Sequence, residues 1–67
     1  MNDYKITMAA ARTNAGISQQ KIADEMHVSR MTIHNWETGK VIPKPAELIL
    51  YCNICKAPIE IIFLPGA

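Results

Sequence analysis

Residues 17–40 read ISQQKIADEMHVSRMTIHNWETGK, and one pattern occurs in them twice. In ISQQKI (17–22) and in VSRMTI (28–33), a β-branched apolar residue precedes a serine, and an isoleucine follows four positions after that serine. A serine at the N-cap of a helix accepts a hydrogen bond from a backbone N–H group that has no partner within the helix. The apolar residue before the cap commonly packs on the residue four positions into the helix. The pattern therefore predicts that one helix begins after Ser18 and another after Ser29.

The spacing of these two starts predicts a helix-turn-helix. The first helix has room only for Gln19–Met26, and the second is expected at Arg30–Thr38. Two short helices joined by three residues form the helix-turn-helix motif. His27 stands where the turn needs a positive φ, which glycine adopts most easily and histidine more readily than most other residues. We therefore interpret His27 as a turn residue, in preference to a metal ligand or a switch.

The rest of the chain is consistent with further helices. Upstream, Met8, Ala11 and Ala15 have helical spacing, and Gly16 is a suitable stop. Downstream, Pro45 suits the first turn of a fourth helix. The expected core-facing stripe of that helix consists of Leu48, Leu50, Tyr51 and Ile54.

The C-terminal segment has two possible interpretations. Pro58 can open a last short helix over Ile59–Leu64, which Pro65 and Gly66 then end. Because β-branched residues dominate IEIIF, the same segment is equally compatible with a strand. The expected fold is thus all-α, a single domain over residues 1–67 with five helices, of which the last is short, with a strand as the alternative for that segment.

Composition limits the class of protein. The chain has 67 residues, of which 49% are hydrophobic, and a formal net charge of +1. It contains no apolar run long enough to span a membrane and no pattern of a secretory signal. Two cysteines are fewer than a disulfide-stabilised secreted domain of this size usually carries, which favours a reducing cytoplasm. The charge alone is weak support for nucleic-acid binding, so the placement of basic residues has to decide.

One face of the second helix carries groups suited to DNA. Ile33 and Trp36 are expected to point inward, and the outward patch consists of Arg30, Met31, His34 and Asn35. Arginine can bond guanine through two hydrogen bonds, asparagine can bond adenine, and an apolar side chain can contact a thymine methyl group. Helix N-termini bind phosphates, which suits Gln19 and Ser29, and Lys40 and Lys44 can reach the backbone. The alternative is an ordinary solvated helix face.

From Arg12 to Lys44 the sequence resembles the Cro/C1-type (Xre) helix-turn-helix regulators of phages and bacteria. The marks of this resemblance are Gln19 at the start of the second helix, Ala23 and Ile33 ten residues apart, and Trp36-Glu37 followed by Gly39-Lys40. The resemblance implies a five-helix, lambda-repressor-like domain whose third helix recognises DNA. The residues it implies for base contacts are Arg30, Met31, Thr32, His34 and Asn35, and those for phosphate contacts are Gln19, Ser29 and Lys40. It also implies a buried ion pair between Arg12 and Glu37, so Arg12 is not counted among the DNA contacts.

Three positions depart from the pattern of that family. His27 stands where glycine is usual, Ala11 is smaller than the leucine common there, and Cys55 stands where glycine or asparagine often ends the fourth helix. None of these changes removes a group that the resemblance assigns to DNA.

Cys52 and Cys55 form a C-x-x-C pair for which we considered metal and redox chemistry. A structural zinc site needs four ligands, and only His27 and His34 are left to add, the latter from the DNA-facing patch. A thioredoxin-like site needs a βαβ surround that the sequence does not predict. We interpret the pair as two small residues at a helix end, with a redox switch on DNA binding as the alternative.

The sequence therefore predicts a cytoplasmic, sequence-specific regulator of transcription, most simply a repressor of phage or prophage style. Because one recognition helix makes few phosphate contacts, we expect a homodimer, formed through Ile59–Leu64, on an inverted-repeat operator. No paired carboxylates, glycine-rich phosphate loop or activated nucleophile indicate an enzyme, a cofactor, a metal or a small-molecule substrate. The alternative is an antitoxin-like protein-interaction module with the same fold.

Overall fold

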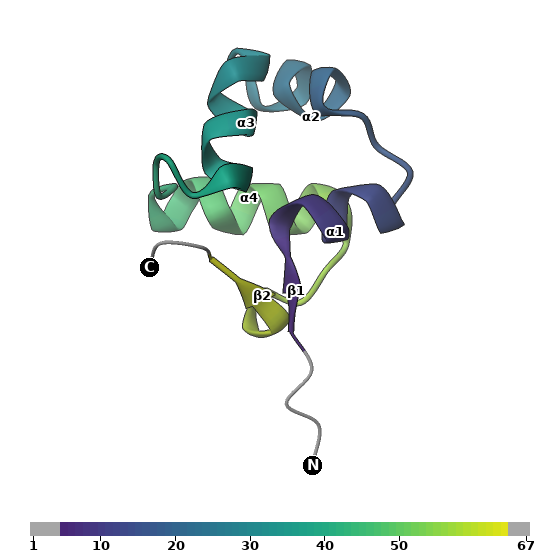
Figure 1. Ribbon diagram of the computed structural model, residues 1–67. Helices are drawn as coiled ribbons and strands as arrows, with labels where there is room; N and C mark the ends of the chain where they lie inside the picture. The colour runs from purple at the N-terminus through teal and green to yellow at the C-terminus, as the bar shows by residue number, and fades with distance from the viewer. Residues whose placement is uncertain (1–4, 65–67) are drawn as a thin grey trace.

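The computed structural model describes residues 5–64 (Figure 1). The elements within this range are β1 (Ile6–Thr7), α1 (Met8–Asn14), α2 (Gln19–Met26), α3 (Arg30–Thr38), α4 (Pro45–Cys55), the 3-10 helix η1 (Ile59–Ile61) and β2 (Ile62–Phe63). In Figure 1, α2 and α3 lie on one side of α4, and the two strands lie on the other. None of the helices in this range is long and apolar enough to cross a membrane.

The predicted fold class is confirmed, with one change in the C-terminal segment. The domain is mostly helical, but in place of the expected fifth helix it has a single 3-10 turn followed by a two-residue strand. β2 pairs in parallel with β1, with Ile6 opposite Ile62 and Thr7 opposite Phe63. The segment therefore contains both of the structures that its sequence allowed: a turn of helix, followed by a strand. Pro65 and Gly66, expected to end it, lie outside the described residues.

The starts of α2 and α3 are as the repeated pattern predicts. The Ser18 side chain accepts a hydrogen bond from the backbone N–H of Lys21 at 3.0 Å, and the Ser29 side chain accepts one from that of Thr32 at 3.1 Å. Ile17 and Val28, the residues before the caps, are partly buried against the core. Both helices have the predicted bounds, which fixes the geometry of the turn between them.

His27 has φ 59° and ψ 41°, the left-handed conformation expected for the turn. This conformation lets the next backbone N–H, that of Val28, reach the carbonyl oxygen of Ala23 at 3.0 Å. A second non-glycine residue with positive φ is Lys56, at 56°. The left-handed residue that ends α4 is thus Lys56, and Cys55 is the last residue of the helix itself.

The core lies between α1, α2, α3 and α4, and includes one residue of β2. Its members are Met8, Ala11, Ile22, Ala23, Met26, Ile33, Trp36, Tyr51, Cys52, Cys55 and Ile62. One prediction of an inward residue is wrong, because Leu50 is 44% exposed. Because α4 carries apolar residues on nearly all sides, its sequence alone does not show which side faces the core. The packing of α4 on α1 and α2 determines that side.

Cys52 and Cys55 also belong to the core, although the predicted core-facing stripe of α4 did not include them. They are free thiols, 2% and 6% exposed. Burial raises the pKa of Cys52, and burial together with the neighbouring Cys52 raises the pKa of Cys55 to about 11. Both side chains are therefore protonated at neutral pH, which opposes thiol–disulfide chemistry.

Candidate nucleic-acid interface

The outer face of α3 is determined by what its inner face packs on. Ile33 is fully buried and Trp36 is 3% exposed, so the opposite side of the helix is left to solvent. Met31 is 60% exposed, and Arg30 and His34 are also exposed. Asn35 is half-buried at the edge of this face. The structure thus brings together the four residues that the helical period had grouped, and we call these four the recognition face.

The remaining residues expected at DNA lie around the two ends of α3. Thr32 is half-buried, and its hydroxyl group is 3.0 Å from that of Ser29, the N-cap, so both hydroxyl groups lie at the N-terminal end of α3. Lys40 follows Gly39, the left-handed residue that ends the helix, and is exposed. Lys44, at the start of α4, is exposed as well. Two exposed lysines therefore follow α3 in the chain, and the N-terminal end of α3 carries free backbone N–H groups that favour an anion.

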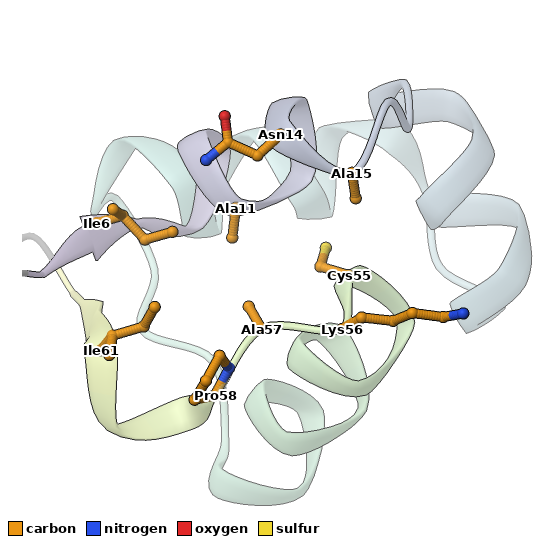
Figure 2. A pocket seen from close by; sticks show the side chains of 9 residues that line it. All are labelled: Ile6, Ala11, Asn14, Ala15, Cys55, Lys56, Ala57, Pro58 and Ile61. Atoms are coloured by element: carbon orange, nitrogen blue, oxygen red, sulfur yellow. The ribbon is translucent and has the colours of Figure 1, made fainter.

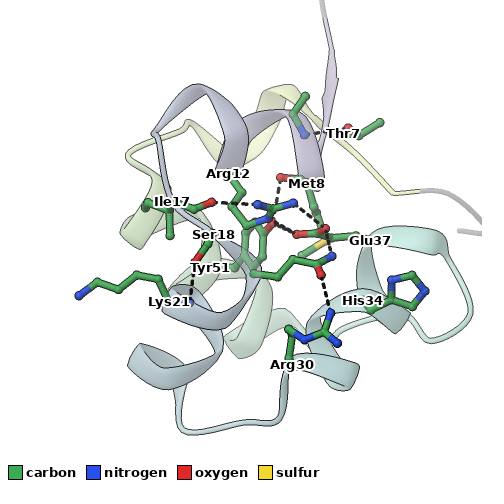
Figure 3. A network of polar contacts seen from close by, with 12 residues as sticks. Thr7, Met8, Arg12, Ile17, Ser18, Lys21, Arg30, His34, Glu37 and Tyr51 are labelled. Atoms are coloured by element: carbon green, nitrogen blue, oxygen red, sulfur yellow. Dashed lines mark hydrogen bonds and ion pairs between the residues drawn. The ribbon is translucent and has the colours of Figure 1, made fainter.

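A network of polar side chains fixes α3 to the rest of the domain (Figure 3). Arg12 on α1 donates to Glu37 on α3 twice, from Nε to Oε2 at 2.7 Å and from Nη2 to Oε1 at 3.2 Å. The third Arg12 contact is to the carbonyl oxygen of Ile17 at 2.8 Å. The Tyr51 hydroxyl on α4 lies 2.6 Å from Glu37 Oε2 and 2.9 Å from the carbonyl oxygen of Met8. The ion pair that the resemblance implies is thus present, with the tyrosine added to it.

The network continues to the recognition face through Gln19, the first residue of α2. Its Nε2 donates to Glu37 Oε1 at 3.0 Å, and its Oε1 accepts from Arg30 Nη1 at 3.3 Å. Gln19 was expected at a DNA phosphate. In the structure its amide lies between two side chains of α3.

A hollow lies away from α3, between α1, the end of α4 and η1 (Figure 2). Its volume is about 280 Å³. Ala11, Ala57 and the Cys55 thiol point into it, whereas the Asn14 amide and the Lys56 ammonium point away. Its walls are thus mainly apolar, and the polar and charged groups suited to DNA are on α3.

The profile of the helix-turn-helix family matches residues 8–62, which is most of the chain and includes all four α-helices. The chain belongs to the Cro/C1-type helix-turn-helix family. No curated protein and no solved structure matches it. Members of this family are DNA-binding transcription regulators, and so is this Cro/C1-type protein.

The pKa of Glu37 is set by burial and by three neighbouring side chains of this Cro/C1-type domain. Burial by itself raises the pKa of Glu37, but hydrogen bonds from Arg12, Tyr51 and Gln19, together with the charge of Arg12, lower it further than burial raises it. The pKa of Arg12 is raised, chiefly by its hydrogen bonds to Glu37. The pair is therefore ionised at neutral pH, although the Glu37 side chain is only 4% exposed.

The lowered pKa of Glu37 predicts a loss of stability in acid. The unfolded chain binds the Glu37 proton near the ordinary pKa, about 4.5, and the folded chain only at lower pH. The contribution of Glu37 is thus fully present above about pH 5 and is lost as the pH falls through the folded pKa. We expect the difference in unfolding free energy between wild type and Glu37→Gln to be constant from pH 5 to 7. Below pH 5 this difference in unfolding free energy should shrink, by at most about 1.4 kcal/mol per pH unit. Urea unfolding at several pH values measures it, and parallel curves down to pH 3 would contradict the assignment.

Sequence reasoning missed two members of the network in this Cro/C1-type protein. Tyr51 was expected only as an apolar core residue, and the inward contacts of Gln19 were not expected at all. The residue type of Tyr51 was itself a signal, because a buried tyrosine needs a hydrogen-bond partner for its hydroxyl group. Nothing local indicates the second, since Gln19 and Glu37 are 18 positions apart and meet only when the motif is folded.

Proposed function

We propose that the protein binds an inverted-repeat operator as a homodimer and represses transcription, with the recognition face of α3 in the major groove. The observation that carries this proposal is the exposure of Arg30, Met31 and His34 on a helix whose other side is anchored in the core. A rigid helix with guanidinium, amide and apolar groups on its outer face has the shape and chemistry that base edges require. A dimer bound in this way blocks other proteins from the same stretch of DNA.

The chemistry of each side chain decides whether we assign it to a base or to a phosphate. Arg30 and Asn35 carry the donors and acceptors for base edges, and Met31 offers an apolar contact to thymine. Lys40 and the α3 N-terminus supply charge and N–H groups for phosphates, which fix orientation without reading sequence. Thr32 and Ser29 form the N-cap, so their hydroxyl groups lie at the helix end that approaches the backbone.

The proposed dimer contact lies in the C-terminal segment. Ile62 is 8% exposed and belongs to the core, whereas its neighbours Ile59 and Phe63 are 42% and 52% exposed. Apolar side chains of this size gain from contact with a second apolar surface. A second copy is the partner we propose because two recognition helices, one DNA turn or about 34 Å apart, double the phosphate contacts that a weakly charged monomer can make.

Two substitutions are expected to separate base contacts from phosphate contacts. Arg30→Ala should cost about 1–3 kcal/mol on the operator and relax the preference at one base position of each half-site. Lys40→Ala should weaken binding to all sequences alike and lower the slope of log K against log salt by about one. Titration of operator and random duplexes at several salt concentrations measures both. Equal losses for both variants on both duplexes would contradict this division.

The proposal as a whole is tested by selection from random double-stranded DNA with the purified protein at about 100 mM salt. Enrichment of a palindrome with half-sites one helical turn apart would support sequence reading and dimeric geometry together. Failure of a folded protein to enrich any sequence would contradict it. The exposed Ile59 and Phe63 would then favour the second candidate, an antitoxin-like module whose partner is another protein.

A further inference from the structure

The hollow between α1, the end of α4 and η1 has room for a small molecule. Its volume is about 280 Å³, and it is open to solvent. By comparison, an engineered apolar cavity of roughly 150 Å³ binds benzene. The side chains directed into the hollow are small, Ala11 from α1 and Cys55 and Ala57 at the end of α4 (Figure 2). The space that they leave is therefore sufficient for a molecule of one or two rings.

The lining of the hollow is apolar and uncharged. Ile6 and Ile61 line it together with the alanines. The two polar side chains at its rim, the Asn14 amide and the Lys56 ammonium, point away from it (Figure 2). A charged group is strongly disfavoured in such surroundings, because it loses water without gaining a partner. A molecule bound in the hollow therefore has to be uncharged and mainly apolar.

The Cys55 thiol gives the hollow a more specific contact group. Its side chain is 6% exposed and points into the hollow, and among residues 5–64 this thiol takes part in no hydrogen bond. Burial, together with the neighbouring Cys52, raises the pKa of Cys55 to about 11, so the group is uncharged at neutral pH. Sulfur is polarisable and packs favourably against aromatic rings. The thiol therefore favours a ring with a π system over a saturated molecule of the same size.

We propose that the hollow is a binding site for a small uncharged aromatic molecule of one or two rings, held between α1 and α4 with its ring against the Cys55 thiol. The site does not depend on the proposed function, because the recognition face is on α3. Binding removes apolar surface of both the ring and the lining from water. A molecule with few atoms gains little in total, so half-saturation is expected on the order of 0.1–1 mM.

The experiment is a nuclear magnetic resonance titration of the ¹⁵N-labelled protein with indole, an uncharged molecule of two rings. We expect saturable shifts of the amide signals that belong to the lining of the hollow, above all those of Ala11, Cys55, Ala57 and Ile61. The charged comparison is indole-3-carboxylate, which has the same rings and a carboxylate. Its half-saturating concentration should be at least about tenfold higher, because its charge would lose water at the apolar lining.

Variants of the lining test where the ring lies. Ala11→Leu and, separately, Ala57→Leu fill the hollow and should each raise the half-saturating concentration of indole at least about tenfold, since the ring and the new side chain compete for one space. Ala46→Leu is the matched control, because it is the same change at an exposed position of α4, and it should have an effect within about twofold. Cys55→Ser should weaken indole binding roughly 2- to 12-fold by removing the sulfur–aromatic contact.

A spectrum of each variant without indole shows whether it is folded, and only folded variants are compared. Leucine is common in this family at the position of Ala11, so that variant is expected to fold, and Ala57→Leu provides an independent test. The proposal is overturned if the indole shifts do not saturate, or if they map to the recognition face or to Ile59 and Phe63. It is also overturned if folded Ala11→Leu and Ala57→Leu bind indole as the wild type does, or if the carboxylate binds as tightly as indole.

Discussion

Arg12→Ala is expected to lower the free energy of unfolding by about 3–5 kcal/mol, because it leaves Glu37 as a buried charge without its ionic partner. Glu37 is the more deeply buried of the two, with a side chain 4% exposed against 14% for Arg12. The stability of a domain this small is only about 3–10 kcal/mol. The expected loss is therefore a large share of the whole stability of the fold. Urea unfolding followed by circular dichroism measures the change.

An exposed ion pair in the same domain provides the control. Lys21 and Glu25, one turn apart on α2, are 3.5 Å apart with side chains 65% and 42% exposed. Lys21→Ala should change the unfolding free energy by less than about 0.5 kcal/mol. Replacing Arg12 and Glu37 together by methionine should recover part of the loss caused by Arg12→Ala, since no charge is then left buried. A loss below about 1 kcal/mol for Arg12→Ala would show that the network does not stabilise the fold.

Phe63→Ser is expected to reduce operator affinity about a hundredfold or more by dissociating the proposed dimer. Two linked recognition helices bind far more tightly than either alone, since the second contact is made at high effective concentration. Phe63 is 52% exposed, so its loss should change the folding of the monomer little. Sedimentation equilibrium measures the dimer, and titration of the operator measures the affinity.

The control for Phe63 is Met31→Ser, which removes an apolar side chain that is 60% exposed on the recognition face instead of the C-terminal segment. It should leave the dimer intact and alter binding only through the base contact. A Phe63→Ser protein that remains dimeric and keeps full affinity would place the interface elsewhere.

The helix-turn-helix could be predicted residue by residue because its boundaries are local. Ser18 and Ser29 cap their helices through residues three positions away, and His27 and Gly39 end them through their own backbone conformation. Each of these interactions lies within a few residues of sequence. The bounds of α2 and α3 were therefore correct.

The face of α4 and the strand pair could not be predicted in the same way. In LILYCNIC nearly every position is apolar, so the sequence allowed Leu50 inside as readily as Cys52. Ile6 and Ile62 pair across the whole length of the domain, and nothing near either residue indicates its partner. In both cases the outcome depends on contacts between distant segments.

The candidate site also has one part that local sequence predicts and one part that depends on contacts between distant segments. The recognition face followed from the helical period of one segment, and three of its four residues, Arg30, Met31 and His34, are exposed in the structure. The link from Glu37 through Gln19 to Arg30 joins two helices, and Tyr51 adds a third. Residue types alone did not place these side chains together.

The recognition face and the core-facing side of α3 are separate, and this has a consequence for how the DNA preference of such a protein can change in evolution. Substitutions at Met31 and His34 fall on exposed positions, where the change in folding free energy is usually within about 0.5 kcal/mol. Descendants of this chain can therefore exchange one preferred DNA sequence for another while the core stays the same. Position 30 is less free, because a new side chain there also has to suit Gln19.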